Sequence, residues 1–291
     1  MQTPAPFEYD RAANVGQALA LLERYGPDTR LVAGGHSLLP MMKLRLAQPQ
    51  RLVDINDLSE LSYVRRDGEA IAIGALTRHA ELLSSPLLTR HWPIFADAER
   101  VIADPIVRNR GTIGGSLCQG DPAEDLSAVV CGLRAEIVIR SASGARTVPA
   151  RDFYLGPYET VVGPAEILTE VRVPVLPRVG SAYEKVERRA GDWAVVAVGC
   201  FLTLQGDTVA DIGIGLAAVN AKGFAAPEAE AALRGRPATA ENFAIAADLV
   251  AQHCRPQADQ RGPEDYKRYL AAELTRRALR RALERARAEG V

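Results

Sequence analysis

Apolar residues recur at helical spacing near the start of the chain. From Val15 to about residue 25 they fall on one face of a helix, which Asn14 is positioned to cap and which Gly26-Pro27 ends. Two short apolar runs with the pattern of strands follow, at residues 30–33 and 52–55, and a Gly-Gly pair comes just after the first run. This order of elements predicts a small α/β unit of roughly fifty-odd residues.

From residue 61 the pattern changes to hairpins and broken helices. The dipeptides Asp67-Gly68 and Ser143-Gly144 each separate two apolar runs, which is a strong signal for a β-hairpin. Helices are expected at 78–83 after a Thr77 cap, at 85–107 with breaks near Pro93 and Pro105, and at 126–131. A second subdomain is therefore expected to begin near residue 58.

The last part of the chain has the pattern of strands followed by helices. Strands are expected at 166–173, 182–188, 194–204 and 209–219, and helices at 226–233, 240–254 and 264–288. Residues 174–180 contain two prolines and a glycine and are the preferred domain boundary. We expect three parts: an N-terminal α/β subdomain at 1–57, a second subdomain at 58–177 and a C-terminal α+β domain at 178–291.

The composition is that of an ordinary globular protein. The 291 residues are 47% hydrophobic and 24% charged, and the formal net charge of −1 gives no reason to expect nucleic acid or an anionic membrane as a partner. No secretory signal or transmembrane stretch is recognisable, so a cytoplasmic protein is expected. The four cysteines include no C-x-x-C pair and the four histidines never fall at i, i+4, so no metal site is expected.

Two glycine pairs have the character of backbone binding sites. We call residues 33–38 (AGGHSL) the first glycine segment and residues 111–116 (GTIGGS) the second glycine segment. Glycine can take a positive φ and lets a ligand approach main-chain N–H groups, as a phosphate requires, and Ser37, Thr112 and Ser116 add hydroxyls. Two such segments could hold a diphosphate between them. The alternative is that both are structural turns.

Other nucleotide and nucleophile motifs fail. There is no P-loop, and residues 35–39 (GHSLL) lack the closing glycine of a nucleophile elbow. Residues 213–218 (GIGLAA) fit a relaxed dinucleotide pattern, but they lie inside a strand-like run with no helix opening behind them.

The two glycine segments and their flanks resemble a known family. The resemblance rests on residues 33–45 (AGGHSLLPMMKLR), 110–115 (RGTIGG) and 121–123 (DPA), and it continues through 183–185 (YEK) and 191–194 (GDWA) to 265–267 (DYK). These motifs are similar to those of the FAD-binding medium subunits of molybdenum hydroxylases, the xanthine dehydrogenase family, and most similar to its aerobic carbon monoxide dehydrogenase branch. The resemblance implies an α+β fold: a two-subdomain FAD-binding region of the PCMH or vanillyl-alcohol-oxidase type, followed by an antiparallel sheet with helices.

The resemblance also implies which residues contact the cofactor. The flavin's diphosphate is expected against the two glycine segments, and the acidic Asp125, the cationic Lys185, the apolar Leu168 and the aromatic Trp193 are expected near the flavin. The full set of implied FAD-binding residues is Ala33, Gly34, Gly35, His36, Ser37, Leu38, Thr112, Ile113, Gly114, Gly115, Ser116, Asp125, Leu168, Lys185 and Trp193. No residue of this chain is expected to be catalytic or to bind a metal.

Several of these positions have ordinary alternatives. Lys185 could be an exposed strand lysine, Leu168 and Trp193 could be core residues, and Cys118 has no assigned role. Trp193 could instead cover one face of the flavin ring system. For Glu124, a simple loop carboxylate is the preferred interpretation.

The implied role is electron transfer within a complex. A large partner subunit would carry the molybdenum cofactor, a small partner would carry 2Fe–2S clusters, and this chain's FAD would pass electrons to an external acceptor, with the complex a dimer of heterotrimers. Carbon monoxide is the first substrate hypothesis, and the complex is expected in the cytoplasm or peripheral at the inner membrane face. The alternatives are an N-heteroaromatic or aldehyde hydroxylase, a free-standing flavin reductase, and a non-catalytic nucleotide-binding scaffold.

Overall fold

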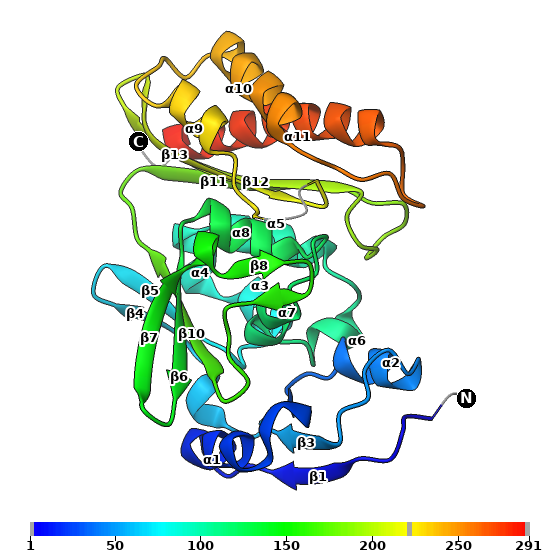
Figure 1. Ribbon diagram of the computed structural model, residues 1–291. Coiled ribbons are helices and arrows are strands. Elements are labelled where there is room, and N and C mark those ends of the chain that lie inside the picture. Colours follow the sequence, from blue (N-terminus) through cyan, green and yellow to red (C-terminus); the bar gives the residue numbers. More distant parts are fainter. Residues whose placement is uncertain (1–2, 220–222, 289–291) are drawn as a thin grey trace.

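The computed structural model describes residues 3–219 and 223–288. Three layers are stacked along the long axis of the molecule (Figure 1): an N-terminal unit with a small sheet, a middle layer with a five-stranded sheet, and a C-terminal layer with a three-stranded sheet. Helices and strands are segregated rather than regularly alternating, so the predicted α+β class is confirmed.

The N-terminal unit is a parallel sheet flanked by helices. Its elements are β1 (Glu8–Arg11), α1 (Val15–Tyr25), η1 (Gly26–Asp28), β2 (Thr29–Val32), α2 (Leu38–Lys43), β3 (Arg51–Asp54) and η2 (Ser59–Leu61). The strand order is β1-β3-β2, with both pairs parallel. The predicted first helix is confirmed, and the Asn14 side chain accepts a hydrogen bond from the Gln17 N–H. Strand β1 was not predicted, because its residues are polar, largely exposed and without alternation.

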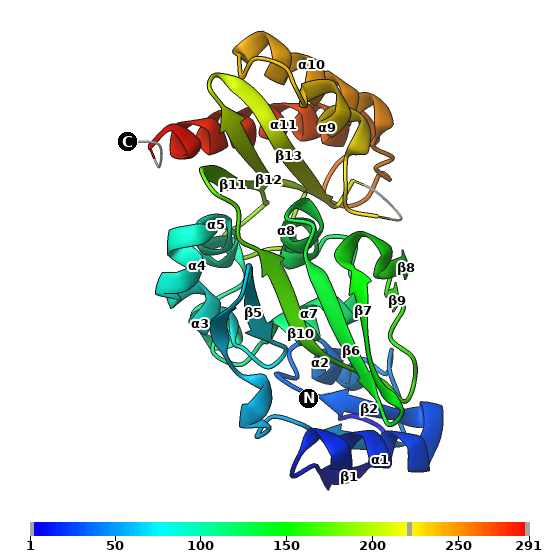
Figure 2. The same cartoon turned by 90° about the vertical axis from the view of Figure 1, so that its left-hand side faces the viewer.

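The middle layer is built around β10 (Ile167–Pro174), which pairs with β5 on one side and with β6 on the other. Its sheet has the order β4-β5-β10-β6-β7 with antiparallel neighbours, and Figure 2 shows β6, β7 and β10 running from the C-terminal layer to the N-terminal unit. The strands are β4 (Val64–Asp67), β5 (Ala70–Gly74), β6 (Glu136–Ser141), β7 (Gly144–Pro149), β8 (Tyr154–Gly156), β9 (Glu159–Thr160) and β10 (Ile167–Pro174). Both predicted hairpins are confirmed.

Short helices pack around this sheet. They are α3 (His79–Ser84), α4 (Pro86–His91), α5 (Ile94–Val101), α6 (Pro105–Arg108), α7 (Ile113–Gln119) and α8 (Asp125–Gly132), with η3 (Ala150–Asp152) after β7. Helix α7 packs against β10 and α4 against β4. The predicted breaks at Pro93 and Pro105 are confirmed. The Thr77 cap was wrong: Arg78 is the N-cap residue of α3, and the Thr77 hydroxyl donates to the Tyr63 carbonyl instead.

The C-terminal layer is an antiparallel sheet between helices. It consists of β11 (Val179–Val186), β12 (Val196–Gln205), β13 (Thr208–Ala217), α9 (Pro227–Leu233), α10 (Ala240–His253) and α11 (Glu264–Ala288). Helix α11 packs on β11 and β12, while α5 and α8 of the middle layer contact the same sheet, as Figure 1 shows. Residues 213–217 of the relaxed dinucleotide pattern lie within β13, which excludes them as a phosphate loop.

An ionic cluster joins α11 to the middle layer. The Asp97 carboxylate on α5 is 2% exposed and accepts hydrogen bonds from Arg281 and Arg285 of α11, each at 2.6 Å. The same carboxylate accepts from the Tyr183 N–H on β11 at 3.3 Å. A charge buried to this extent is tolerated because several donors surround it.

Candidate FAD-binding site

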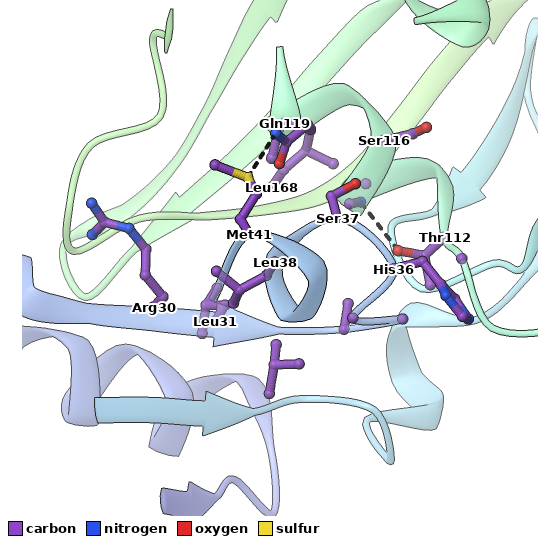
Figure 3. Close-up of a pocket in the computed structure, with 18 of the residues that line it drawn as sticks. Arg30, Leu31, His36, Ser37, Leu38, Met41, Thr112, Ser116, Gln119 and Leu168 are labelled. Atoms are coloured by element: carbon purple, nitrogen blue, oxygen red, sulfur yellow. Dashed lines mark hydrogen bonds between the residues drawn. The ribbon is translucent and has the colours of Figure 1, made fainter. Parts of the chain in front are cut away.

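A deep cleft separates the N-terminal unit from the middle layer. Its volume is about 1080 Å³, and both glycine segments line it. Figure 3 shows the first segment approaching from β2 and α2 and the second from α7 on the opposite wall. Small-molecule pockets span roughly 300–1,000 Å³, so this cleft has room for a ligand of dinucleotide size.

The first glycine segment presents free backbone donors to this cleft. Gly35 has φ +78°, a conformation that glycine adopts without strain, and the chain then turns into α2. Within the described residues, the N–H groups of Gly35, His36, Ser37 and Leu38 donate to no other group of the chain. Unpaired N–H groups along one concave wall suit an anion, as the sequence predicted.

The second glycine segment differs from its prediction. It is not a loop: Thr112 caps α7, and Gly114 and Gly115 lie in its first turn. The following N–H groups are already bonded, Ile113 to the Thr77 carbonyl, Gly114 to the Ala75 carbonyl, Gly115 to the Thr112 hydroxyl and Ser116 to the Thr112 carbonyl. The prediction that these groups are free donors for a diphosphate was therefore wrong.

The hydroxyls of the second segment are also partly used. Ser116 Oγ donates to Glu124 Oε1 at 2.7 Å, so its proton does not face a ligand. Glu124 is buried and also accepts from the N–H groups of Leu126 and Ser127, which makes it the cap of α8 rather than a simple loop carboxylate. Thr112 accepts from Gly115 and keeps its own hydroxyl proton available.

The two segments touch each other directly. A side chain at Gly34 would collide with the backbone of Arg110 and would lie 2.7 Å from the Gly111 Cα atom. Only glycine permits this approach, and it holds the two walls of the cleft in a fixed relation.

Asp125 and Lys185 form a buried ion pair beside the cleft. Asp125 lines the cleft, and its carboxylate accepts from Lys185 Nζ at 2.9 Å and from the Tyr183 hydroxyl at 2.6 Å. The Lys185 side chain is only 2% exposed, so the exposed-lysine alternative is wrong. Lys185 does not line the cleft itself and acts on it through Asp125. Burial raises the pKa of Asp125 to about 6, while Lys185 and Tyr183 counteract that rise.

The remaining predicted residues divide between the core and the cleft. Ile113 is fully buried and does not line the cleft. Leu168 is 4% exposed and belongs to both the core and the cleft wall. Trp193 is 41% exposed at the cleft, so the core-tryptophan alternative is wrong. All residues of the first glycine segment line the cleft, including Ala33, Gly34 and the exposed His36.

Some cleft residues had no sequence signal. Ile102 follows α5, Tyr158 lies in the turn between β8 and β9, and His79 begins α3; all three line the cleft. Each is an ordinary residue in its local pattern, and only the packing of distant elements brings it to this site.

Comparison with known proteins gives the family. Residues 5–176 match the family model "FAD binding domain in molybdopterin dehydrogenase", and residues 181–282 match "CO dehydrogenase flavoprotein C-terminal domain". The chain belongs to the FAD-binding medium subunits of molybdenum hydroxylases.

Individual relatives agree over nearly their full lengths. The carbon monoxide dehydrogenase medium chain of Hydrogenophaga pseudoflava is 43% identical, covering 96% of this chain and 98% of the relative. The glyceraldehyde dehydrogenase medium chain of Sulfolobus acidocaldarius is 39% identical, covering 95% of this chain and 98% of the relative. The solved structure of the Hydrogenophaga pseudoflava carbon monoxide dehydrogenase superposes with a TM-score of 0.95 at 45% identity, covering 97% of this chain and 99% of the solved chain.

Membership makes this chain a flavoprotein subunit of an oxidoreductase that has large and small partner subunits. Its residues fit the cofactor of the family, because the first glycine segment offers unpaired N–H donors in a cleft of sufficient volume. Among the described helices, none is long and apolar enough to cross a bilayer. Within residues 3–219 and 223–288, no cluster of three metal-binding side chains was found.

Proposed function

We propose that this medium subunit binds one FAD in the cleft and relays electrons within an aerobic carbon monoxide dehydrogenase. The observation that carries the proposal is the row of four unpaired N–H groups from Gly35 to Leu38, facing a cleft of dinucleotide size. The 43% identity to a carbon monoxide dehydrogenase medium chain over almost the whole length supports the choice of complex.

Each part of the cleft has a distinct task in this proposal. The first glycine segment would hold the diphosphate through N–H donors, and the second would form the opposite wall. Asp125, held by Lys185 and Tyr183, would accept hydrogen bonds from the polar edge of the flavin, while Leu168 and Trp193 would limit access of water to the ring system. When bound, FAD supplies the ability to accept electrons from one partner and pass them to another.

The rest of the complex follows from this division of labour. The large subunit would carry the molybdenum cofactor and oxidise carbon monoxide with water to carbon dioxide, two protons and two electrons, and the small subunit would carry the 2Fe–2S clusters. We propose a dimer of heterotrimers in the cytoplasm or peripheral at the inner membrane face, with an external electron acceptor. The proposed parts of this chain remain 1–57 and 58–177 for FAD binding and 178–291 for the C-terminal domain.

An aldehyde hydroxylase is the second candidate. The glyceraldehyde dehydrogenase medium chain is nearly as similar, at 39% identity, as the carbon monoxide dehydrogenase chain. The substrate would bind to the large subunit, so the medium subunit's cleft does not distinguish the two.

Native co-purification tests the proposal. The chain should elute with one larger and one smaller partner subunit, and FAD, molybdenum and iron should be in the same peak. Native mass spectrometry should give two copies of each subunit. Anaerobic carbon monoxide should bleach the flavin absorption of the complex, whereas glyceraldehyde should not. Bleaching by an aldehyde or an N-heteroaromatic compound alone would reassign the substrate, activity of the isolated chain would indicate a free-standing reductase, and a colourless chain without partners would overturn the function.

A further inference from the structure

A buried histidine and glutamate lie under the second glycine segment. His79 Nδ1 is 3.1 Å from both carboxylate oxygens of Glu99 on α5, and Glu99 is fully buried. His79 lines the cleft, and its Nε2 donates to no group within the described part of the chain. One ring nitrogen is therefore anchored by Glu99, and the Cδ2–Nε2 edge of the ring lies against Gly111 in the cleft wall.

The His79 ring supports the contact between the glycine segments. The His79 N–H donates to the Gly111 carbonyl at 3.1 Å. A side chain at Gly111 would lie 2.7 Å from His79 Cδ2 and 3.1 Å from Nε2, so the ring packs directly against this residue. Since Gly111 in turn contacts Gly34, the three residues form a stack that runs from α3 through the second segment to the first.

The charges around the cleft give this ring a second task. Among the acids that line the cleft, Asp125, Glu166 and Asp192 have cationic partners in Lys185, Arg146 and Arg188, whereas Glu124 forms no ion pair with a basic side chain of the described residues and lies near His79. A diphosphate adds further negative charge to this cleft. A cation inside the wall would offset that charge at the point where the segments meet.

The groups that face the pair favour the charged ring. Burial alone would lower the pKa of His79, but the attraction to Glu99, with contributions from Glu124 and Asp125, outweighs burial and raises it. Burial raises the pKa of Glu99. The charges of His79 and Arg108 oppose this rise, and the charge of Glu124 adds to it. The nearby groups from α5, α6 and the start of α8 are thus mostly carboxylates.

We propose that His79, held by Glu99, is a positioning residue of the FAD site: its imidazolium supports the stacked glycine segments and offsets cleft carboxylates when the diphosphate binds. The inference rests on the proposed function, because it concerns the affinity of that site for FAD. It makes FAD binding and protonation of His79 mutually dependent, so each must strengthen the other.

The test is FAD affinity of the full chain as a function of pH, combined with NMR titration of its histidine rings. Above the pH range in which Asp125 takes up its proton, the dissociation constant for FAD should rise as the pH passes the pKa of His79 in the free chain. A tenfold rise corresponds to about one unit of difference between the pKa of His79 with and without FAD, and NMR should find that same difference. His79→Gln should bind weakly at all pH values without this dependence, and Glu99→Gln should shift the dependence to lower pH.

Two other histidines serve as comparisons. His253→Gln changes an exposed residue on α10 and should keep the wild-type affinity and pH dependence. His36→Gln removes the other cleft histidine and should retain the pH dependence. Loss of the dependence in His36→Gln with retention in His79→Gln would overturn the inference.

The outcomes separate this inference from the proposed function. If the wild-type chain binds no FAD at any pH, the proposed function fails. If it binds FAD while the pKa of His79 is the same with and without the cofactor, only the role of His79 fails. The wild-type NMR titration decides this even if circular dichroism shows that His79→Gln does not fold.

Discussion

The Lys185 ammonium lies 2.9 Å from the Asp125 carboxylate, is almost fully buried, and connects the C-terminal sheet to the edge of the cleft. Lys185 also donates to the Val101 carbonyl at 3.1 Å and lies 3.4 Å from Glu187. The pair places a carboxylate at the cleft wall and holds it through groups from α5 and β11.

Removing the cation of this pair should damage both stability and binding. Lys185→Met leaves the Asp125 carboxylate buried without its ammonium partner, so the pKa of Asp125 should rise and the free energy of unfolding should fall by about 3 kcal/mol. FAD affinity should fall because a protonated Asp125 is a poorer acceptor. Denaturant titration and flavin fluorescence measure the two effects. Arg140→Met, at an exposed position of β6, is the control, and equal effects in the two variants would contradict the role of the pair.

The raised pKa of Asp125 predicts a pH dependence of stability. Between about pH 4 and 6 the folded chain keeps a proton that the unfolded chain has lost, so the free energy of unfolding should fall as pH rises through this window and level off above it. Relative to Asp125→Asn, which cannot titrate, the wild type should lose at most about 3 kcal/mol across the window. Parallel curves for the two proteins would show that the pKa of Asp125 is not raised.

A single methyl group at the first glycine segment should weaken FAD binding. Gly35 has φ +78°, and an added Cβ would lie 2.9 Å from Leu39 Cδ1, so Gly35→Ala should displace the turn that orients the free N–H groups. We expect a cost of about 1–2 kcal/mol in stability and at least a comparable loss in binding.

Gly68→Ala is the matched control for Gly35→Ala. Gly68 also has a positive φ, +59°, but it lies in the β4–β5 turn with open space around it. The stability of Gly68→Ala should fall about as much as that of Gly35→Ala, while its FAD affinity stays at the wild-type value. Loss of affinity in both variants would mean that general destabilisation, and not the segment, is being measured. Gly114→Val is a weaker test, because its side chain would meet Ala75 at 2.8 Å and disturb the core.

Trp193 should shield bound flavin at the cleft. Trp193→Ala removes this cover and, because the residue is 41% exposed, should lower the free energy of unfolding by less than truncation of a fully buried tryptophan does. Collisional quenching of bound flavin by iodide should become faster. Tyr269→Ala, on α11 and 63% exposed, should leave quenching unchanged. Unaltered quenching in Trp193→Ala would remove the shielding role.

The ionic cluster at Asp97 should hold α11 on the middle layer. Arg285→Ala leaves a 2% exposed carboxylate short of donors, so the free energy of unfolding should fall by about 2–3 kcal/mol. Arg280→Ala, at an exposed position of the same helix, should change it by less than about 0.5 kcal/mol. Equal decreases in the free energy of unfolding of Arg285→Ala and Arg280→Ala, measured by denaturant titration, would mean that Arg285 contributes no more than a surface arginine.

The sequence predicted features that depend on local chemistry. The Asn14 cap, the Asp67-Gly68 hairpin and the positive φ at Gly35 each follow from one residue type in a short pattern. The first glycine segment carries unpaired backbone N–H groups, and its contact with a diphosphate stays a prediction.

Features that depend on distant packing were missed or misassigned. The N–H groups of Ile113 and Gly114 are bonded to Thr77 and Ala75, which a reading of residues 111–116 alone does not reveal. Likewise, Lys185 is buried only because Asp125 and α5 lie beneath its strand. His79 had no signal, because its partner Glu99 is twenty residues away and on another helix.

The most direct test of the central claim is a titration of the purified chain with FAD, followed by flavin absorbance and equilibrium dialysis. The structure predicts saturable binding with one FAD per chain, because one cleft brings the unpaired N–H groups of the first segment and the Asp125 carboxylate to a common site. Absence of saturable binding by the folded chain, or binding of the same strength in Gly35→Ala, would contradict it.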